Sequence, residues 1–496
     1  MLGDQLNRRI GALGAAQPGE ARVLLVESAT KLRSKRFHRQ RLHVVLASMR
    51  NLAAELRHEG FEVDHRRSSS LAEGLAEHRA AYRPGSVRAS EPLSWDAERL
   101  ITGLDVQLVP SDQFLCHRDD FARWADAQGA KRLVMENFYR WQRRRLGYLM
   151  DGDEPAGGRW NLDAENREPP PKGGRGPWPA PMTWPIDDID RAVVADLPPT
   201  AFGRGPGPAT RLWPTSRGEA LDRLRHVVDE VLPHFGPHED AILQEDWHLA
   251  HTLLSSSLNL GLLLPEEVCD AVEAAYRNGA VPLNSAEGLV RQIIGWREYV
   301  WGLYWRWMPA FRTRNELEAT RPLPPAFTGQ APTAMRCVAT ALDGVEQRGW
   351  AHHIQRLMVL SNLSMMAGVR PNELVEWMWA SFVDGSEWVM VPNVVGMGQH
   401  ADGGSMATKP YAGGGAYINR MSDHCRRCRY DPRLRTGDDA CPFTTLYWDF
   451  LDRHRERFAH NPRMVRQIRG LDRLGDLDGV RVRAAEVLDQ LDRGQL

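Results

Sequence analysis

Residues 21–63 read ARVLLVESATKLRSKRFHRQRLHVVLASMRNLAAELRHEGFEV, and this stretch decides the fold of the N-terminal part of the chain. The apolar run at residues 22–26 predicts a strand. In residues 42–57 the apolar positions recur at helical spacing and stop at Gly60. A second strand is expected to begin at residues 61–63. Strand, helix and strand in this order are typical of a parallel sheet covered by helices.

The same alternation continues outward, with further strands expected at residues 86–89 and 106–109. Residues 1–125 are therefore predicted to form a Rossmann-like α/β domain. Residues 2–6, LGDQL, look like the turn that follows a strand. Residues 126–215 are expected to be a connector, because residues 150–215 are rich in Gly, Pro and Trp and include the run Pro169-Pro170-Pro171.

Helical patterns dominate from residue 216 to residue 496, for example at residues 219–231, 265–277, 285–305 and 352–367. They predict a large all-α domain. The chain is 42% hydrophobic and 26% charged, with no apolar run long enough to cross a membrane and no export signal, so a cytoplasmic protein is expected. The net charge of −1 does not indicate nucleic-acid binding, but basic residues cluster at 31–41, 140–145 and 420–435.

The six cysteines are too few to cross-link a chain of this length, but three of them form a compact group. The pattern is Cys425-x2-Cys428-x12-Cys441, and Cys337 lies upstream as a fourth candidate ligand. Four thiolates are the ligand set of a zinc ion and also of a [4Fe–4S] cluster, and spacing alone leaves both open. Cys116 and Cys269 have no partner at such spacing and are interpreted as packing residues.

Four longer runs carry a family resemblance: GGRWNLDAENR at 157–167, RQIIGWREY at 291–299, AHHIQRLM at 351–358 and YINRMSD at 417–423. In this order they resemble the bacterial iron–sulfur cryptochrome/photolyase family, whose repair members are prokaryotic (6-4) photolyases. The resemblance implies the cryptochrome/photolyase fold, with an all-α FAD-binding domain. It also implies a [4Fe–4S] cluster on Cys337, Cys425, Cys428 and Cys441.

The function implied by the resemblance is light-driven repair of UV-damaged DNA by a monomer, in which reduced FAD transfers an electron to a (6-4) pyrimidine photoproduct. A blue-light photoreceptor of the cryptochrome type, built on the same scaffold without repair activity, is the alternative. A nucleic-acid-binding protein that is not an enzyme and carries a structural metal is a second alternative.

Residues 251–261, HTLLSSSLNLG, resemble the family's flavin-phosphate segment. Hydroxyls and free backbone N–H groups near a helix start can hold a pyrophosphate, although a serine-rich start can also cap itself. The flavin-binding residues expected from the resemblance are Thr252, Leu254, Ser255, Ser256, Ser257, Arg291, Trp296, Glu298, Asn393, Met397, Asp402 and Tyr417.

The catalytic residues expected from the resemblance are His353, His352, Tyr411 and Arg356. His352 and His353 are adjacent, so on a helix they point in different directions and only one is expected to face a substrate. The resemblance favours His353 as the group that exchanges a proton with the lesion. Arg356 lies one turn further on, where it is expected to hold a phosphate or carbonyl on the same side.

Electron transfer to the flavin is assigned by the resemblance to Trp377, with Trp388 as a further candidate. The chain departs from the family here, because Met378 and Ser386 stand where relatives have tyrosines and Phe327 stands where one has a tryptophan. Trp379 and Trp388 are close enough in sequence to substitute.

A 6,7-dimethyl-8-ribityllumazine antenna is implied in the N-terminal domain, with Asp4 and Glu27 in suitable places. Lys31, however, stands where the family has a glutamate, and this reversed charge argues for altered or abolished antenna binding.

Overall fold

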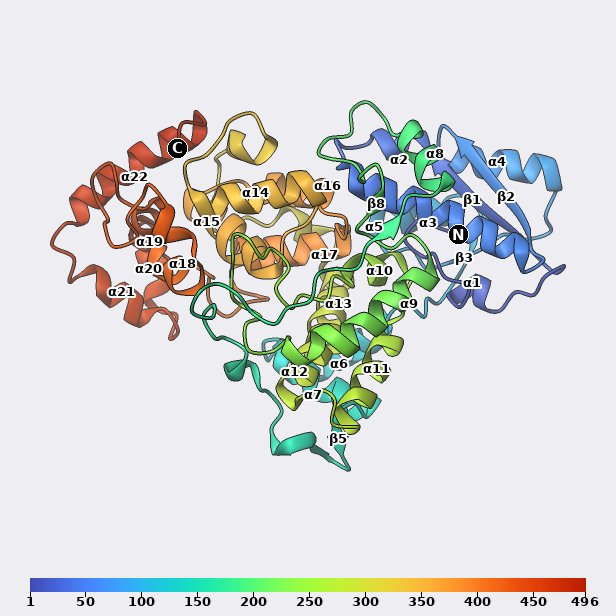
Figure 1. Cartoon of the computed structure of the whole chain (residues 1–496), viewed down its shortest axis with the longest axis horizontal. Coiled ribbons are helices and arrows are strands. Elements are labelled where there is room, and N and C mark those ends of the chain that lie inside the picture. The colour runs from blue at the N-terminus through green and yellow to red at the C-terminus, as the bar shows by residue number, and fades with distance from the viewer.

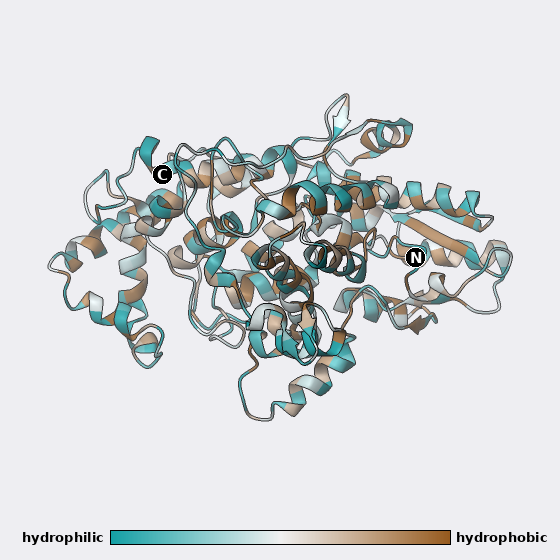
Figure 2. Ribbon diagram, turned by 60° about the horizontal axis from the view of Figure 1, so that its bottom comes forward, coloured by the Kyte–Doolittle hydropathy of each residue, from teal (hydrophilic) through white to brown (hydrophobic).

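The computed structural model describes residues 1–496. Figure 1 shows the N-terminal α/β part and the last helices of the chain at opposite ends of the long axis, with the remaining helices between them. Most helices carry one apolar and one hydrophilic face (Figure 2). One hydrophobic core of 105 buried residues runs from Leu6 to Leu496, so both parts of the chain share it. No helix has both the length and the apolar character needed to span a bilayer.

The elements of the N-terminal part are α1 (Gly11–Gly14), β1 (Arg22–Ser28), α2 (Ala29–Arg33), α3 (Arg39–His58), β2 (Glu62–Ser68), α4 (Leu71–Tyr82), β3 (Arg88–Ser90), α5 (Trp95–Thr102), β4 (Gln107–Val109) and α6 (Arg118–Ala127). They match the expected alternation closely. Strand β1 is largely buried, in keeping with its apolar run, whereas β2 is charged and only partly buried.

The parallel, helix-covered arrangement is confirmed, but the strands form two separate parallel pairs, β1–β2 and β3–β4, instead of one sheet. Residues 1–6 contact both pairs. The Met1 amine donates to the carbonyl of Leu24 at 3.0 Å, and Gln5 Nε2 donates to the carbonyl of Glu91 at 2.6 Å. The expected turn at the start is present, because the backbone N–H of Gln5 donates to the carbonyl of Leu2.

The region between the α/β and helical parts contains α7 (Met135–Leu146), β5 (Met150–Asp151), β6 (Glu154–Pro155), η1 (Ala156–Gly158), η2 (Asp163–Glu165), β7 (Trp184–Pro185), α8 (Asp188–Asp196) and β8 (Thr210–Arg211). Buried ion pairs hold this region in place. Asp190 accepts from Arg211 at 2.7 Å and lies 3.0 Å from His43 of α3, and Arg211 also binds Glu219. Although burial opposes it, these hydrogen bonds lower the pKa of Asp190 to about 2.

The helical part comprises α9 (Arg217–His226), η3 (Val227–Val231), η4 (Leu232–His234), α10 (Ser255–Leu260), α11 (Pro265–Arg277), α12 (Leu283–Val290), η5 (Arg291–Arg297), α13 (Glu298–Trp307), η6 (Ala310–Thr313), η7 (Pro325–Thr328), α14 (Arg336–Arg348), η8 (Gln355–Ser361), α15 (Asn362–Ala367), α16 (Pro371–Ser381), α17 (Glu387–Val391), η9 (Pro392–Gly398), α18 (Gly415–Met421), η10 (His424–Arg427), α19 (Pro442–Arg453), α20 (Arg455–Ala459), α21 (Val465–Leu471) and α22 (Leu477–Asp492).

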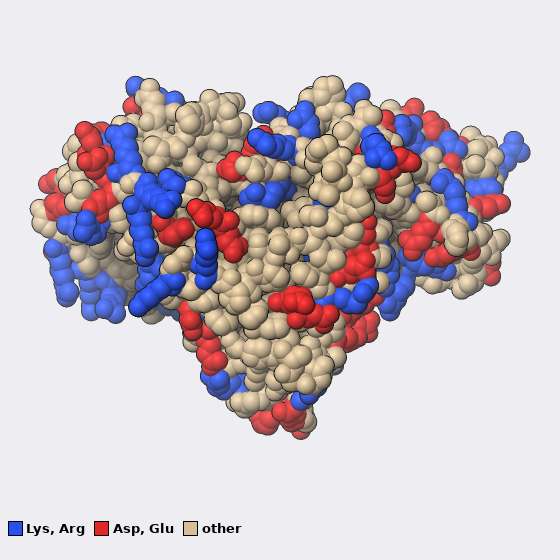
Figure 3. Space-filling model, viewed as in Figure 1, with Lys and Arg blue, Asp and Glu red and all other residues tan.

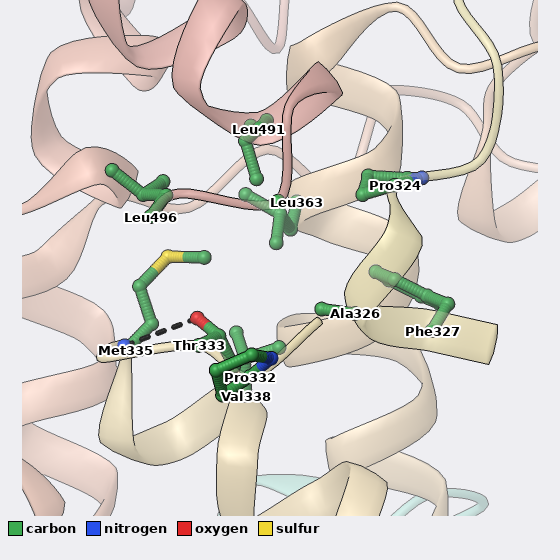
Figure 4. Close-up of a pocket in the computed structure, with 11 residues that line it drawn as sticks. Pro324, Ala326, Phe327, Pro332, Thr333, Met335, Val338, Leu363, Leu491 and Leu496 are labelled. Carbon is green, nitrogen blue, oxygen red and sulfur yellow. Dashed lines mark hydrogen bonds between the residues drawn. The ribbon is translucent and has the colours of Figure 1, made fainter. Parts of the chain in front are cut away.

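The end of the chain packs back onto the helical part. Figure 4 shows Leu491 and Leu496 facing Phe327 and Met335 across a small apolar hollow. The hollow has a volume of about 10 Å³, which is room for about one water molecule. It is therefore a packing defect and not a ligand site.

Helices α6 and α13 approach each other at a glycine. A Cβ atom placed on Gly302 would lie 2.1 Å from ring atoms of Phe121, and the Phe121 ring is itself fixed against Phe138, with ring centroids 5.2 Å apart. The contact requires glycine at position 302, because the packed Phe121 ring leaves no room for a side chain there.

We expect Gly302→Ala to lower the free energy of unfolding by about 1–3 kcal/mol, since overpacking forces α6 and α13 apart. Gly218→Ala on α9 is the matched control, because nothing lies within 4 Å of the added methyl group and alanine favours a helix. Chemical denaturation of the two variants measures the difference. Equal stability of the two variants would contradict the close contact.

Candidate functional site

The serine segment expected to hold a flavin phosphate begins helix α10. Ser255 Oγ donates to Asp384 Oδ2 at 2.7 Å. The hydroxyls of Ser256 and Ser257 are buried and have no hydrogen-bond partner. No side chain caps the helix, so these hydroxyls and the first backbone N–H groups are free to bind an anion.

A partly buried ion pair between Arg356 and Asp384 lies beside this segment. The guanidinium forms two parallel hydrogen bonds to the carboxylate, at 2.9 and 3.1 Å, and its Nε donates to the carbonyl of Ala351 at 2.6 Å. Its carbon lies 4.0 Å from the centre of the Phe382 ring. Arg356 was expected to reach a phosphate or carbonyl on the side of His353, but its guanidinium is committed to Asp384 instead.

Asp384 was missed by the sequence reasoning. It joins three segments, because it accepts from Ser255 and Arg356 and its backbone carbonyl accepts from Asn259 Nδ2 at 2.8 Å. An aspartate followed by a glycine has the sequence signature of a turn. Nothing in the sequence distinguishes it from a surface turn, so no sequence signal pointed to this residue.

The two adjacent histidines point in different directions, as expected. His352 is 1% exposed, with both ring nitrogens unpartnered, and it stacks on His251 with ring centroids 4.7 Å apart. The His353 side chain is 47% exposed, and its Nε2 lies 3.4 Å from Asp240 Oδ1. His353 is therefore the one that can reach a substrate.

The charges around the histidines set their protonation. Burial lowers the pKa of His251 and of His352 well below the usual range, so both are neutral. Burial also opposes protonation of His353, but the hydrogen bond to Asp240 and the charge of Glu239 outweigh it and raise the pKa of His353. The site thus holds one protonatable histidine among neutral ones.

The three imidazoles have ligand nitrogens within 4.8 Å of one another. The ring planes of His251 and His352 are only 14° from parallel. Because the lone pair of an imidazole lies in its ring plane, these two rings cannot converge on one metal ion without turning. The cluster is better suited to proton exchange than to metal binding.

Glu239 and Asp240 were also missed by the sequence reasoning, because they lie in an irregular segment with no motif. Gln292 Nε2 donates to Glu239 Oε1 at 3.0 Å, and burial raises the pKa of Glu239 to about 7. A carboxyl group that changes charge near neutral pH beside an exposed histidine is typical of a functional site.

Tyr411 and Tyr417 flank the glycine-rich loop and are half-buried. The charges of Asp240 and Arg167 act on both phenols, which places both tyrosines on the His353 side of the site. Burial raises the pKa of both, that of Tyr417 to about 12. A Cβ atom on Gly413 would lie 2.9 Å from Met358, so the loop backbone approaches the helical wall closely.

Several expected flavin ligands have other partners. Arg291 pairs with Asp163 at 3.0 Å, and Glu298 binds Arg297 at 3.1 Å. The Glu298 carboxylate also accepts from the N–H of Cys116, and burial raises its pKa to about 6. Both residues are thus engaged in holding elements together.

The carboxylate of Asp402 accepts from the N–H groups of Gly404 and Met406, which shapes its own loop. Asn393 Nδ2 donates to the carbonyl of Val389 at 2.9 Å. The remaining expected ligands have no polar partner: Thr252, Met397 and Trp296 are half-buried, and Leu254 is buried.

The two expected electron-transfer residues have different surroundings. Trp377 Nε1 donates to the carbonyl of Phe327, and its ring contacts only phenylalanines, Phe327 and Phe382. Trp388 is 1% exposed and contacts Phe114 and Trp301, with centroid distances of 5.0 and 5.7 Å.

The residues expected to hold an antenna have different partners. Glu27 is bound by Arg50 at 2.8 and 2.9 Å and lies 3.0 Å from His65. Although burial opposes it, these partners lower its pKa to about 2. Asp4 is half-buried; burial raises its pKa, and the charge of Lys31 opposes that rise.

The four cysteines come together from α14, η10 and α19. Cys337 is buried and the other three are half-buried, and the charges of Cys425, Cys428 and Cys441 all act on Cys337. No three of the sulfur atoms lie within 4.8 Å of one another. Four thiolates can hold a zinc ion, with zinc–sulfur bonds of about 2.3 Å, or a [4Fe–4S] cluster, and the residues present fit either centre.

The raised pKa of Glu239 predicts a pH dependence of stability. The native state keeps a proton on Glu239 that the unfolded chain releases above its ordinary pKa of 4.5, so its contribution to stability falls as the pH rises from 4.5 to about 7. We expect Glu239→Gln to gain stability relative to the wild type between about pH 5 and about pH 8. Thermal unfolding at both pH values measures this, with the exposed Glu245→Gln as control. Parallel curves for wild type and Glu239→Gln would contradict it.

Comparison with known proteins connects this site to a family. Residues 1–211 match the family model described as deoxyribodipyrimidine photo-lyase-related protein. The chain is 39% identical to the (6-4) photolyase of Agrobacterium fabrum over 507 aligned positions, which cover 99% of each chain. It is also 30% identical over 101 residues to an uncharacterised protein of Acanthamoeba polyphaga mimivirus, covering 20% of this chain and 75% of that one.

Among solved structures, the crystal structure of a bacterial class III photolyase from Agrobacterium tumefaciens matches with a TM-score of 0.56. It covers 99% of this chain and 96% of that chain at 16% identity. This likeness shows the photolyase fold, and the full-length relative shows the family. The chain belongs to the bacterial family of deoxyribodipyrimidine photo-lyase-related proteins.

Proposed function

We propose that this protein is a DNA photolyase that reverses (6-4) pyrimidine photoproducts in light with bound FAD. The observation that carries the proposal is His353, exposed and held by Asp240, three residues before Arg356 and its network to Ser255. The full-length relative named (6-4) photolyase supports the lesion type.

The flavin fits the serine segment on chemical grounds. The unpartnered buried hydroxyls of Ser256 and Ser257 would bind its pyrophosphate. The Arg356–Asp384 pair and the loop at Gly413 would border the rest of the molecule, and Asn393 and Tyr417 are proposed as further neighbours. Bound FAD supplies the light absorption and the electron that the protein itself lacks.

The protein residues have separate tasks in this proposal. His353 gives a proton to the lesion and takes it back, and Asp240 keeps its ring oriented and charged. Neutral His352 and His251 form the wall behind it. Tyr411 lies beside the space for the flipped bases, which leave the DNA stack more easily at a lesion than in intact DNA.

DNA binding is assigned to arginines in the C-terminal part of the chain. Lys and Arg side chains gather over the C-terminal helices (Figure 3). Four arginines there are exposed and have no carboxylate partner, so they are free to bind phosphates: Arg420, Arg426, Arg427 and Arg429. Arg420 lies 5.6 Å from the Tyr417 ring, which connects this surface to the site.

The cysteine group is proposed to hold a [4Fe–4S] cluster on Cys337, Cys425, Cys428 and Cys441. The four thiols gathered from distant segments, and the close approach of Gly415, where a Cβ would lie 3.1 Å from Cys441 Sγ, support this proposal. Because its ligands come from α14, η10 and α19, the cluster would hold these three elements together. A lumazine antenna is not part of the proposal, because Glu27 is fully paired and Lys31 opposes the expected charge.

The proposed activity is tested by illuminating the purified protein with oligonucleotides that contain either a (6-4) product or a cyclobutane dimer. We expect restored thymines from the (6-4) product only, and His353→Asn should slow this repair by about 10²–10⁴-fold. The exposed His460→Asn serves as control. A protein that binds FAD but repairs neither lesion would instead be a photoreceptor, and a protein without FAD would overturn the proposal.

The cluster is tested separately. We expect Cys428→Ser to lose iron and acid-labile sulfide and to unfold at lower temperature, because a metal centre bound only by the native state stabilises it. Cys116→Ser, which lies outside the group, should keep its iron. Zinc without iron in the wild-type protein would refute the assignment.

A further inference from the structure

A continuous row of tryptophan rings runs from the buried helix α17 toward the surface. It begins at Trp388, four residues after Asp384. The ring centroids of Trp388 and Trp301 lie 5.7 Å apart, those of Trp301 and Trp305 5.5 Å, and those of Trp305 and Trp95 6.3 Å. Trp388 and Trp301 are 1% and 5% exposed, whereas Trp305 and Trp95 are half-buried. The row therefore connects the interior to solvent.

Regular secondary structure holds the row in place. Trp301 and Trp305 lie four residues apart on α13 and so share one face of that helix. Helix α13 packs against α17, which carries Trp388. Phe114 stacks on Trp301 with centroids 4.0 Å apart and planes 5° from parallel, which fixes the middle of the row.

The route implied by the family resemblance is interrupted in this chain. The aromatic rings that pair with Trp377 are those of Phe327 and Phe382, and a phenyl ring is much harder to oxidise than an indole. Positions 378 and 386 hold methionine and serine. Trp379 stacks with no aromatic ring; its neighbours are the ammonium groups of Lys31 and Lys35.

Charged groups along the row favour outward movement of a positive charge. The Arg297 guanidinium lies 5.3 Å from the Trp388 ring and disfavours a cation there, whereas no arginine or lysine stacks on Trp301. Arg118 lies 4.6 Å from Trp305, but Glu91 binds it at 3.0 Å and Glu98 also pairs with it, which offsets its charge.

We propose that Trp388, Trp301, Trp305 and Trp95 form the electron path by which the bound flavin is reduced in light; this rests on the flavin site proposed above. Bound FAD would supply the light-excited electron acceptor, and Trp388 would give it one electron. The positive charge would then move outward to Trp301, Trp305 and Trp95, because each ring gives an electron to its inner neighbour. Each refilling of Trp95 would take one electron from a thiol in solution. For every two electrons passed inward, two thiols would join in one disulfide and release two protons to water.

The path is tested by photoreduction of the bound flavin in the presence of a thiol, followed as loss of the oxidised-flavin absorption. We expect Trp301→Phe to slow it at least about tenfold. Trp305→Phe should give the same result and shorten the lifetime of the tryptophan-radical signal in transient absorption, because the charge then returns to the flavin. Trp307→Phe is the matched control, since its ring on the same helix contacts only Phe311 and Arg314.

Flavin content and unfolding temperature are measured for every variant, so that a folding defect in Trp301→Phe is recognised. In that case the half-buried Trp305→Phe variant tests the path. If both variants photoreduce as fast as wild type while Trp377→Phe does not, the path is wrong although the flavin site stands. If the wild-type protein takes up no flavin, the proposed function fails first and this inference with it.

Discussion

The partly buried ion pair between Arg356 and Asp384 is the interaction on which the site depends. It connects η8, the turn before α17 and the start of α10, because Ser255 and Asn259 also bind Asp384. Two charges removed from water are costly unless every hydrogen bond is made, and here the guanidinium and carboxylate satisfy one another in parallel with a carbonyl as third partner. Removing either residue would leave a buried charge alone. The pair therefore fixes one relative position of three segments that are far apart in sequence.

The connector between the α/β part and the helical part also depends on buried charges. It joins the two parts through ion pairs and not through regular secondary structure. Arg211 binds Asp190 and Glu219, and His43 of α3 meets the same Asp190. Trp213 Nε1 donates to the carbonyl of Arg348, so the connector also contacts α14. A Gly- and Pro-rich segment forms few regular backbone hydrogen bonds. Its position is therefore set by the few side chains that bind buried partners.

The sequence predicts what depends on local pattern. Helix α11 begins and ends where apolar spacing places it, and β1 follows from its apolar run. The cysteine group and the divergent directions of His352 and His353 follow from spacing. Glu239, Asp240 and Asp384 leave no such signal, because a carboxylate in an irregular segment becomes functional only through neighbours brought by the fold. The partners of Arg356 and Glu27 leave no signal for the same reason: a charged side chain in sequence does not reveal which residue will bind it.

Proton handling and electron supply enter the site along different elements. His353 precedes Arg356 on the segment leading into η8, and its partners Asp240 and Glu239 come from the irregular segment before α10. Trp388 follows Asp384 on α17, and its partners come from α13. The Arg356–Asp384 pair is the junction of the two, so the groups that titrate are kept apart from the rings that would carry charge. A positive charge on Trp388 would be disfavoured by the Arg297 guanidinium, which lies 5.3 Å from its ring, whereas the carboxylates of Asp240 and Glu239 favour a positive charge on His353. The two side chains thus lie in electrostatic surroundings of opposite character.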